Sequence, residues 1–404
     1  PPTPHSPTSD QMTTIRWTQS HSFGTDPSNF VIAPRAYHSA TIVGHEMYVI
    51  GGTRGQSFFS DVRVVDLAGE QRDYSIPRLI TSKGTGQFSD IAVRGEASKP
   101  FEGRSRHIAV AVWNADGKPS IYVFGGVHGG QEMFRLSLGG VLEWHRIKAI
   151  GKKPPSLFSH CAASIGRKVY VFGGVDRQSQ CSSSVFVFDT MLSQWERIED
   201  AEGTPPPPSP HYKMHAIGEM LVIIGNAAEG PRMRNFQDRV NVYMLNVQEG
   251  AAKRWCLLDT LGGQKIPRLH DMFETVALYN NAEVLQKGPV GRRLQIMLFD
   301  GALAASGSSK SSKTGKSGSA TSKSSSSSAS NFDTDVAADA PRIWVLEFAD
   351  DMETSVASLT YSIVGVPGSQ YTPSLRVGHS IAALIPQNVI KDDGEWGRGV
   401  SGHS

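Results

Sequence analysis

Hydrophobic residues in this chain fall into short runs rather than long amphipathic stretches. Five of the runs are apolar at consecutive positions and end in a glycine pair or a close relative of one. These runs are Tyr48–Gly52, Tyr122–Gly126, Tyr170–Gly174, Val222–Asn226 and Met297–Gly301. A short run that is apolar at every position predicts a strand buried on both faces. The glycines predict a sharp turn with positive φ that packs closely against its neighbours.

The glycine turns recur with a period. The spacings are 74 residues from Gly51 to Gly125, 48 to Gly173, 52 to Gly225 and 75 to Asp300. Two of them match a repeat of about 50 residues, and the other two are about 25 residues longer. Each long interval contains a polar or Gly-rich insertion, so the period indicates a repeat protein with insertions.

Two further landmarks accompany each glycine turn. A histidine precedes the apolar run, although in the fourth copy His211 and His215 compete for this position. The other copies have His38, His107, His160, His270 and His379. After the glycines come a second apolar run and a strand with one aromatic residue. These aromatic residues are Tyr74, Trp144, Trp195, Trp255 and Tyr361. Each repeat therefore predicts four short strands.

The order of histidine, apolar strand, Gly-Gly, apolar strand and tryptophan resembles the kelch repeat. The resemblance covers residues 12–390 and is specific in the first three copies, weaker in the last three. It implies an all-β fold, a kelch-type β-propeller in which four-stranded blades stand radially and bury both of their faces.

The ring is expected to have six four-stranded blades, the last one split between the two termini. Five repeats are complete. A sixth begins with His379–Leu384, and Ile15–Thr18 resembles its missing outer strand. Sharing one blade between the termini is what the resemblance to kelch propellers implies. No apolar run ending in glycines follows Leu384, so the sixth blade is either degenerate or truncated.

Several segments are expected to lie outside the blades. Residues 1–11 and 391–404 are polar tails, and the first is predicted to be disordered. Residues 306–330 form a Ser/Lys-rich tract that cannot bury enough apolar surface to fold, so we expect a disordered loop. This tract is either a tolerated linker or a tether regulated by phosphorylation. Residues 82–103 form a long loop insertion, which is either passive or a partner-binding arm.

Composition narrows the classes of function. The chain has 404 residues and a net charge of +2, without the basic excess typical of nucleic-acid binders. No apolar stretch approaches the 18 residues of a membrane span. The three cysteines lack CxxC spacing, so no disulfide framework or zinc site is expected. We expect a cytoplasmic protein, with the nucleus left open, and no cofactor.

The sequence favours a binding protein over an enzyme. Most of the suggestive histidines occupy the same position in successive repeats, which the repeat itself explains. No HExxH, GxSxG or P-loop motif occurs. A copper oxidase similar to galactose oxidase would need a Tyr/His copper site with a cross-linked cysteine, and the three cysteines have no such context.

The resemblance implies that a partner binds on one face of the ring, around the central channel. Residues just before each histidine would line the channel mouth: Arg35, Tyr37, Arg104, Arg106, Phe158, Tyr212, Arg268 and Arg376. Converging arginines favour an acidic or phosphorylated peptide. In the alternative interpretation, several of these arginines only satisfy backbone carbonyls or neighbouring carboxylates.

We therefore expect a non-enzymatic protein–protein interaction platform, a monomeric propeller that binds a protein or peptide. The alternative is a regulatory or substrate-binding lobe of a multidomain enzyme, such as a kelch-fused phosphatase or methyltransferase.

Overall fold

The computed structural model of the chain describes the greater part of five repeats. The described residues are 34–44, 46–66, 78–79, 94–95, 102–138, 142–226, 240–258, 269, 273–279, 281, 294–299, 343–348 and 359–363.

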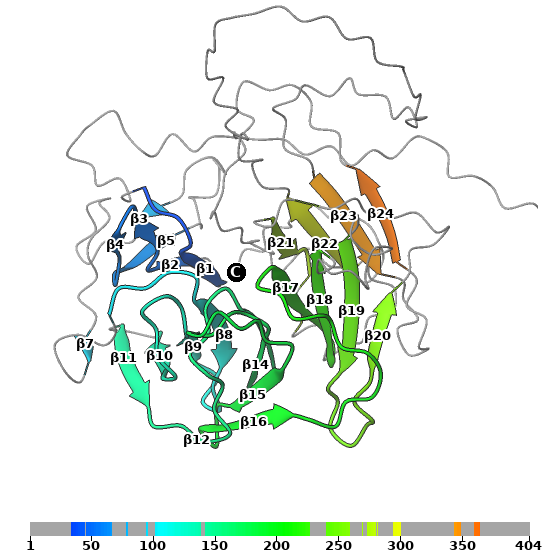
Figure 1. Cartoon of the computed structure of the whole chain (residues 1–404). Helices are drawn as coiled ribbons and strands as arrows, with labels where there is room; N and C mark the ends of the chain where they lie inside the picture. The colour runs from blue at the N-terminus through cyan, green and yellow to red at the C-terminus, as the bar shows by residue number, and fades with distance from the viewer. Residues whose placement is uncertain are drawn as a thin grey trace, which may run out of the picture.

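Within these residues, five antiparallel sheets stand side by side around a common centre (Figure 1). The first blade contains β1 (Ser39–Val43), β2 (Glu46–Ile50), β5 (Val62–Asp66) and β6 (Arg78–Leu79). The second contains β8 (Ile108–Trp113), β9 (Pro119–Phe124), β10 (Met133–Ser137) and β11 (Glu143–Ile147). The third contains β13 (Cys161–Ile165), β14 (Lys168–Phe172), β15 (Val185–Asp189) and β16 (Gln194–Ile198). The fourth contains β17 (Tyr212–Ile217), β18 (Met220–Asn226), β19 (Val240–Asn246) and β20 (Trp255–Leu258). The fifth contains β21 (Glu274–Ala277), β22 (Leu294–Phe299), β23 (Ile343–Phe348) and β24 (Leu359–Ile363).

Four two-residue strands complete this inventory. The second and third blades each gain a parallel strand at the outer edge, β7 (Arg94–Gly95) beside β11 and β12 (Ile150–Gly151) beside β16. A small hairpin of β3 (Thr53–Arg54) and β4 (Ser57–Phe58) follows the first glycine pair.

The second strand of each blade lies deepest, as the consecutive apolar runs predict. In β9, Ile121, Val123 and Phe124 have no exposed surface, and Leu221–Ile224 of β18 have none either. A strand between two neighbouring blades cannot alternate polar and apolar residues, because both of its faces meet protein. The outer strands keep their tryptophans inside: Trp144, Trp195 and Trp255 are all buried.

The core lies between blades rather than within them. One apolar cluster joins the first and second blades through residues such as Ile50 and Trp144. Equivalent clusters join the second blade to the third around Phe124 and Trp195, and the third to the fourth around Phe172. A further cluster joins the fourth to the fifth. The described blades are therefore stabilised mainly by packing against adjacent blades.

Strand pairing gives the ring two distinct faces. In the third blade, Cys161 at the start of β13 pairs with Phe172 at the end of β14. The histidine that precedes β13 and the glycine pair that follows β14 therefore lie on the same face, which we call the glycine face. The loop 175–184, between β14 and β15, also lies there. The turn 190–193, between β15 and β16, lies on the opposite face.

The predicted fold class is confirmed, since the described sheets are all-β and arranged as a propeller. The fifth blade forms as expected across its long insertion, because β22 and β23 pair directly although residues 300–342 separate them. The split sixth blade, the tails 1–11 and 391–404 and the tract 306–330 lie outside the described residues, as does nearly all of 82–103. In the described part of the chain, no helix is both long and apolar enough to cross a membrane.

Candidate functional site

In the first three blades the residue before the histidine has an unusual backbone conformation. Tyr37, Arg106 and Ser159 occupy equivalent positions and have φ values of 57°, 56° and 53°. Non-glycine residues rarely adopt positive φ, so surrounding contacts must hold them there. The backbone N–H of Arg106 donates to the carbonyl of Tyr37 (2.9 Å), and that of Ser159 donates to the carbonyl of Arg106 (3.0 Å). These three positions thus form a hydrogen-bonded chain from blade to blade around the channel.

The histidines pack against the glycine pairs on both sides. A Cβ on Gly126 would lie 2.9 Å from the Cβ of His107, in the same blade. A Cβ on Gly125 would lie 2.6 Å from Cε1 of His160, in the next blade. In the first two blades the first glycine of the pair makes room for the next blade's histidine, and in the first three blades the second glycine makes room for the histidine of its own blade. This junction explains why the two motifs recur together.

Burial keeps these histidines neutral. It lowers the pKa of His107 to about 3 and the pKa of His160 to about 3. The Nε2 atom of His107 lies 3.0 Å from the hydroxyl of Ser39, which ties the second blade to the first. Packing between blades thus accounts for the repeated histidines without a catalytic role.

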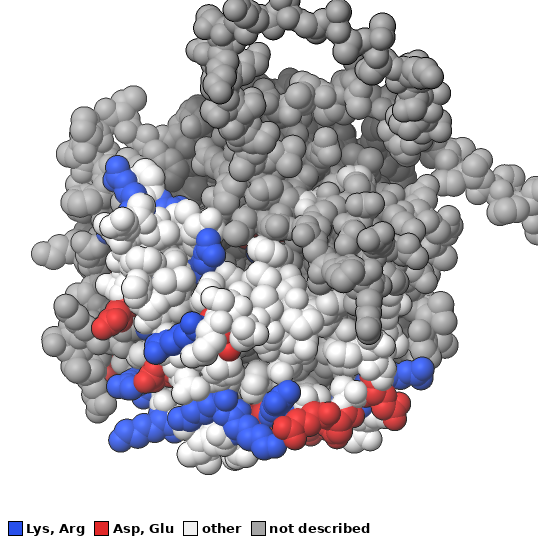
Figure 2. Space-filling view, viewed as in Figure 1, with Lys and Arg blue, Asp and Glu red and all other residues white. Residues whose placement is uncertain are grey.

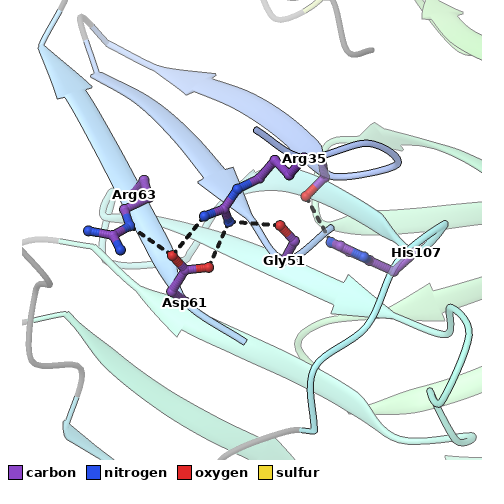
Figure 3. A network of polar contacts seen from close by, with 6 residues as sticks. Arg35, Gly51, Asp61, Arg63 and His107 are labelled. Atoms are coloured by element: carbon purple, nitrogen blue, oxygen red, sulfur yellow. Dashed lines mark hydrogen bonds and ion pairs between the residues drawn. The ribbon is translucent and has the colours of Figure 1, made fainter. Parts of the chain in front are cut away.

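Arg35 is held inside the first blade (Figure 3). Its two terminal nitrogens donate to the carboxylate of Asp61 at 2.7 and 3.0 Å, and one also donates to the carbonyl of Gly51 (2.9 Å). Arg63 donates to Asp61 from the other side (2.7 Å). Because the Arg35 side chain is only 3% exposed, it stabilises the loop and presents little surface to a ligand.

Arg104 occupies the equivalent position in the second blade and is also buried, with 3% exposure. One terminal nitrogen donates to the carbonyl of Gly125 (3.2 Å), and the guanidinium lies 5.0 Å from the ring centre of Phe134. Burial lowers the pKa of Arg104 to about 10. Arg35 and Arg104 therefore have the geometry of the alternative interpretation, in which arginines satisfy carbonyls and carboxylates.

The other predicted site residues differ in exposure. Tyr212 is 4% exposed, and its hydroxyl donates to the carbonyl of Pro207 (2.9 Å). It occupies the histidine position of the fourth blade, because the next residue, Lys213, pairs with Ile224 just before the turn. Phe158 is half-buried and pairs with Val175 on the glycine face. Arg268 and Arg376 lie outside the described residues.

Tyr37 and Arg106 meet at the wall of a central cavity of about 250 Å³. The guanidinium of Arg106 lies 4.3 Å from the ring centre of Tyr37, a cation–π contact between the second and first blades. The first strand of each of the five described blades, which we call the inner strand, contributes to the cavity wall. Lys213 and Glu274 add an ion pair (2.8 Å) between the fourth and fifth blades.

Lys213, Glu274, Ser159 and His211 also line the cavity, and the sequence reasoning missed them. The strand register could have identified Lys213. Gly225 marks the end of the second strand, and counting the antiparallel pairs back from it puts Lys213 at the start of the strand that lines the cavity. In the fifth blade the same counting places Phe273, with no exposed surface, in the histidine position instead of His270.

Charge is distributed unevenly over the surface. Figure 2 shows charged side chains gathered toward the rim near β12 and β16, while the surface nearer the centre carries few. Lys152 and Glu199 form one of these rim ion pairs (3.1 Å). Among the described residues, no group of three His, Cys, Asp or Glu side chains is placed to hold a metal ion.

Comparison with known proteins agrees with this geometry. The family model described as the KLHDC2/KLHL20/DRC7 Kelch-repeats domain matches residues 78–282, and the Kelch motif matches residues 34–73. The histidine–glycine junctions and the radial blades define a kelch propeller. The chain belongs to the kelch-repeat family.

Two of the three relatives described here are longer than this chain. The chain is similar to human host cell factor 2, with 27% identity over 48% of this chain and 26% of that protein. It is similar to acyl-CoA-binding domain-containing protein 6 of Oryza sativa subsp. japonica, with 25% identity over 48% of this chain and 28% of that protein. The Mus musculus Rab9 effector protein with kelch motifs shares 29% identity over 48% of each chain. The chain thus spans about a quarter to a half of these relatives.

Proposed function

We propose that this chain is a non-enzymatic protein–protein interaction platform that binds a partner protein or peptide on the glycine face, around the central channel. The observation that carries the proposal is the convergence of inner strands from five blades on one cavity, with Tyr37 and Arg106 at its wall. Variable loops on a rigid ring suit recognition of a specific partner. The proposal includes a monomeric propeller in the cytoplasm that needs no cofactor.

The chemistry of the partner follows from which arginine is accessible. Arg35 and Arg104 are buried in internal contacts, so recognition of an acidic or phosphorylated segment depends on Arg106. Stacking on Tyr37 holds its guanidinium plane while leaving the N–H edge available. No ion pair with another described residue occupies Arg106. Lys213 is 27% exposed and adds a second cation, partly offset by Glu274.

The printed names of the relatives give limited support. The Mus musculus relative is called an effector of Rab9, which is a description of a protein that acts through a protein partner. We extend only the general mode of action to this chain.

The experiment is affinity purification of the tagged chain from its native cells with quantitative mass spectrometry. Arg106→Glu is compared with Arg167→Glu, which makes the same charge change at an exposed turn on the opposite face. Loss of a stoichiometric partner with Arg106→Glu alone supports the proposal. Equal retention by both variants, each shown to be folded by circular dichroism, places binding elsewhere and contradicts it.

A second candidate function is a regulatory or substrate-binding lobe of a larger enzyme. One observation favours it: two relatives are much longer than this chain, and one of them is named for an acyl-CoA-binding domain. Sequencing the full-length transcript tests it, because a catalytic motif outside residues 1–404 is required.

A further inference from the structure

A proline-rich segment leads into the fourth blade. Between β16 and β17 the chain reads Thr204-Pro205-Pro206-Pro207-Pro208-Ser209-Pro210. Proline fixes φ near −65°, and the residue before a proline is driven toward extended conformations. A run of this composition therefore favours the polyproline II helix, which has three residues per turn and no internal hydrogen bonds.

The burial of this segment follows a period of three. Pro206 and Ser209 are buried, while Pro205 and Pro208 are exposed. Pro207, between the two classes, is half-buried. A polyproline II helix lying along the blade would give this pattern, because residues three apart share one edge. One edge faces the protein. Thr204, Pro205 and Pro208 are exposed on the outward edge, and half-buried Pro207 lies at its border.

The equivalent segment of the third blade shows which prolines the fold requires. Gly151 and Gly203 have φ values of 83° and 82°, and each lies against the carbonyl of its blade's outer tryptophan. Counting from these glycines aligns Pro154 with Pro206, and both are buried.

The exposed prolines have no counterpart in the third blade. Lys153 aligns with Pro205, and Ser156 aligns with Pro208. The junction between blades thus forms equally well with lysine and serine at these positions. Packing of the fold does not account for the outward-facing prolines of the fourth blade.

The segment is anchored at both ends. The backbone of Glu202 accepts from Trp255 (2.8 Å) and donates to Lys253 (2.9 Å), which fixes the start to the outer edge of the fourth blade. The hydroxyl of Tyr212 holds the carbonyl of Pro207 at 2.9 Å. A segment that is already ordered loses little conformational entropy when it binds.

We propose that the outward edge of residues 204–208 is a docking site for an SH3-type domain. Domains of this class bind polyproline II segments in a groove lined with aromatic side chains. Two x-Pro dipeptides separated by one inward-facing residue, Pro206, present the pattern that such a groove takes. The site runs along the flank of the fourth blade and works independently of Arg106 at the channel.

The test uses an array of purified SH3, WW and EVH1 domains, probed with the folded chain. The variant Pro205→Lys/Pro208→Ser inserts the residues of the third blade and should keep the fold, checked by circular dichroism and thermal unfolding. The control Lys153→Ala/Ser156→Ala changes the same two positions of the third blade. Domains that bind are titrated by biolayer interferometry.

We expect at least one SH3 domain to bind the wild-type chain and the control equally, and to lose about tenfold affinity or more with Pro205→Lys/Pro208→Ser. The assignment is overturned if no SH3 domain on the array distinguishes the proline variant from the wild type. It is also overturned if only WW or EVH1 domains respond to the substitution.

Discussion

His160 of the third blade packs directly over Gly125 of the second. A Cβ built on Gly125 would lie 2.6 Å from Cε1 of this histidine and would also collide with the carbonyl of Leu157. The N–H of Gly126 donates to that same carbonyl (2.8 Å). A side chain at Gly125 would therefore separate two blades and weaken the backbone contact that joins them.

Gly125→Ala should destabilise the protein far more than a matched glycine substitution. Gly125 has φ +66° and Gly117 has φ +74°, but a Cβ on Gly117 would meet nothing within 4 Å. We expect Gly117→Ala to cost about 1 kcal/mol for the positive φ. Gly125→Ala adds overpacking, for a total of roughly 2 to 4 kcal/mol. Urea unfolding measures both, and equal losses would show that the junction is not tightly packed.

His160→Phe should make stability less sensitive to acid. Because burial lowers the pKa of His160 to about 3, protons bind this group in the unfolded chain before they bind it in the folded one. The stability that buried, neutral His160 contributes is fully present above about pH 6.5, the pKa of histidine in the unfolded chain. It is lost as pH falls toward the folded pKa of about 3. Phe273 already fills this position in the fifth blade, so the substitution should be tolerated.

Urea unfolding of His160→Phe between pH 4 and 7 checks this. The slope of unfolding free energy against pH should be shallower than in the wild type by about 1.4 kcal/mol per pH unit over the range where His160 titrates in the unfolded chain. An unchanged slope would mean that His160 is accessible to protons in the native state.

Asp61→Asn should change the pH dependence of the unfolding free energy in a more acidic range than His160→Phe does. Burial alone would raise the pKa of Asp61, but hydrogen bonds and charges from Arg35 and Arg63 outweigh it and hold the pKa below its ordinary value. The ionised form therefore stabilises the fold above the unfolded pKa of about 3.9, and this contribution is lost as pH falls further. The difference in unfolding free energy between wild type and variant should be constant above pH 5 or so and shrink below about 4. A difference that grows on acidification would contradict the ion pairs.

Cys161 and Cys181 should react with iodoacetamide at different rates. Cys181 is exposed, whereas burial raises the pKa of Cys161 to about 12. Since the thiolate is the reactive form, native protein at pH 8 should be labelled at Cys181 and protected at Cys161. Peptide mass spectrometry reads the labelling, and urea should make both sites reactive. Rapid labelling of Cys161 in the native state would show that the third blade opens locally.

Sequence was sufficient for the blades because their signals are local. Each glycine pair follows a strand buried on both faces, so the run of apolar residues and the turn identify one another. Where the histidine is missing from its position, the sequence assigns a wrong neighbouring residue to that position. In the fourth blade Tyr212 replaces the histidine, and only the pairing of Lys213 with Ile224 defines the position.

The sequence could not predict which arginines are buried in internal contacts and which line the cavity. Arg35 finds its partner Asp61 after the chain has passed through β2 and the hairpin of β3 and β4, so the pair depends on the path of those loops. Arg106 differs from Arg104 by two residues, yet one lines the cavity and the other is buried. Arg106 has a φ of 56°, a conformation that its residue type does not predict.

Site-specific photocrosslinking tests the central claim most directly. A photoreactive amino acid replaces exposed Gln178, on the glycine face of the third blade, or exposed Leu192, on the opposite face of the same blade. Both positions lie in turns, so both variants should fold. If the glycine face binds the partner, irradiation of cells should give a discrete protein adduct from position 178 and none from position 192. A discrete adduct from position 192 alone would contradict the account.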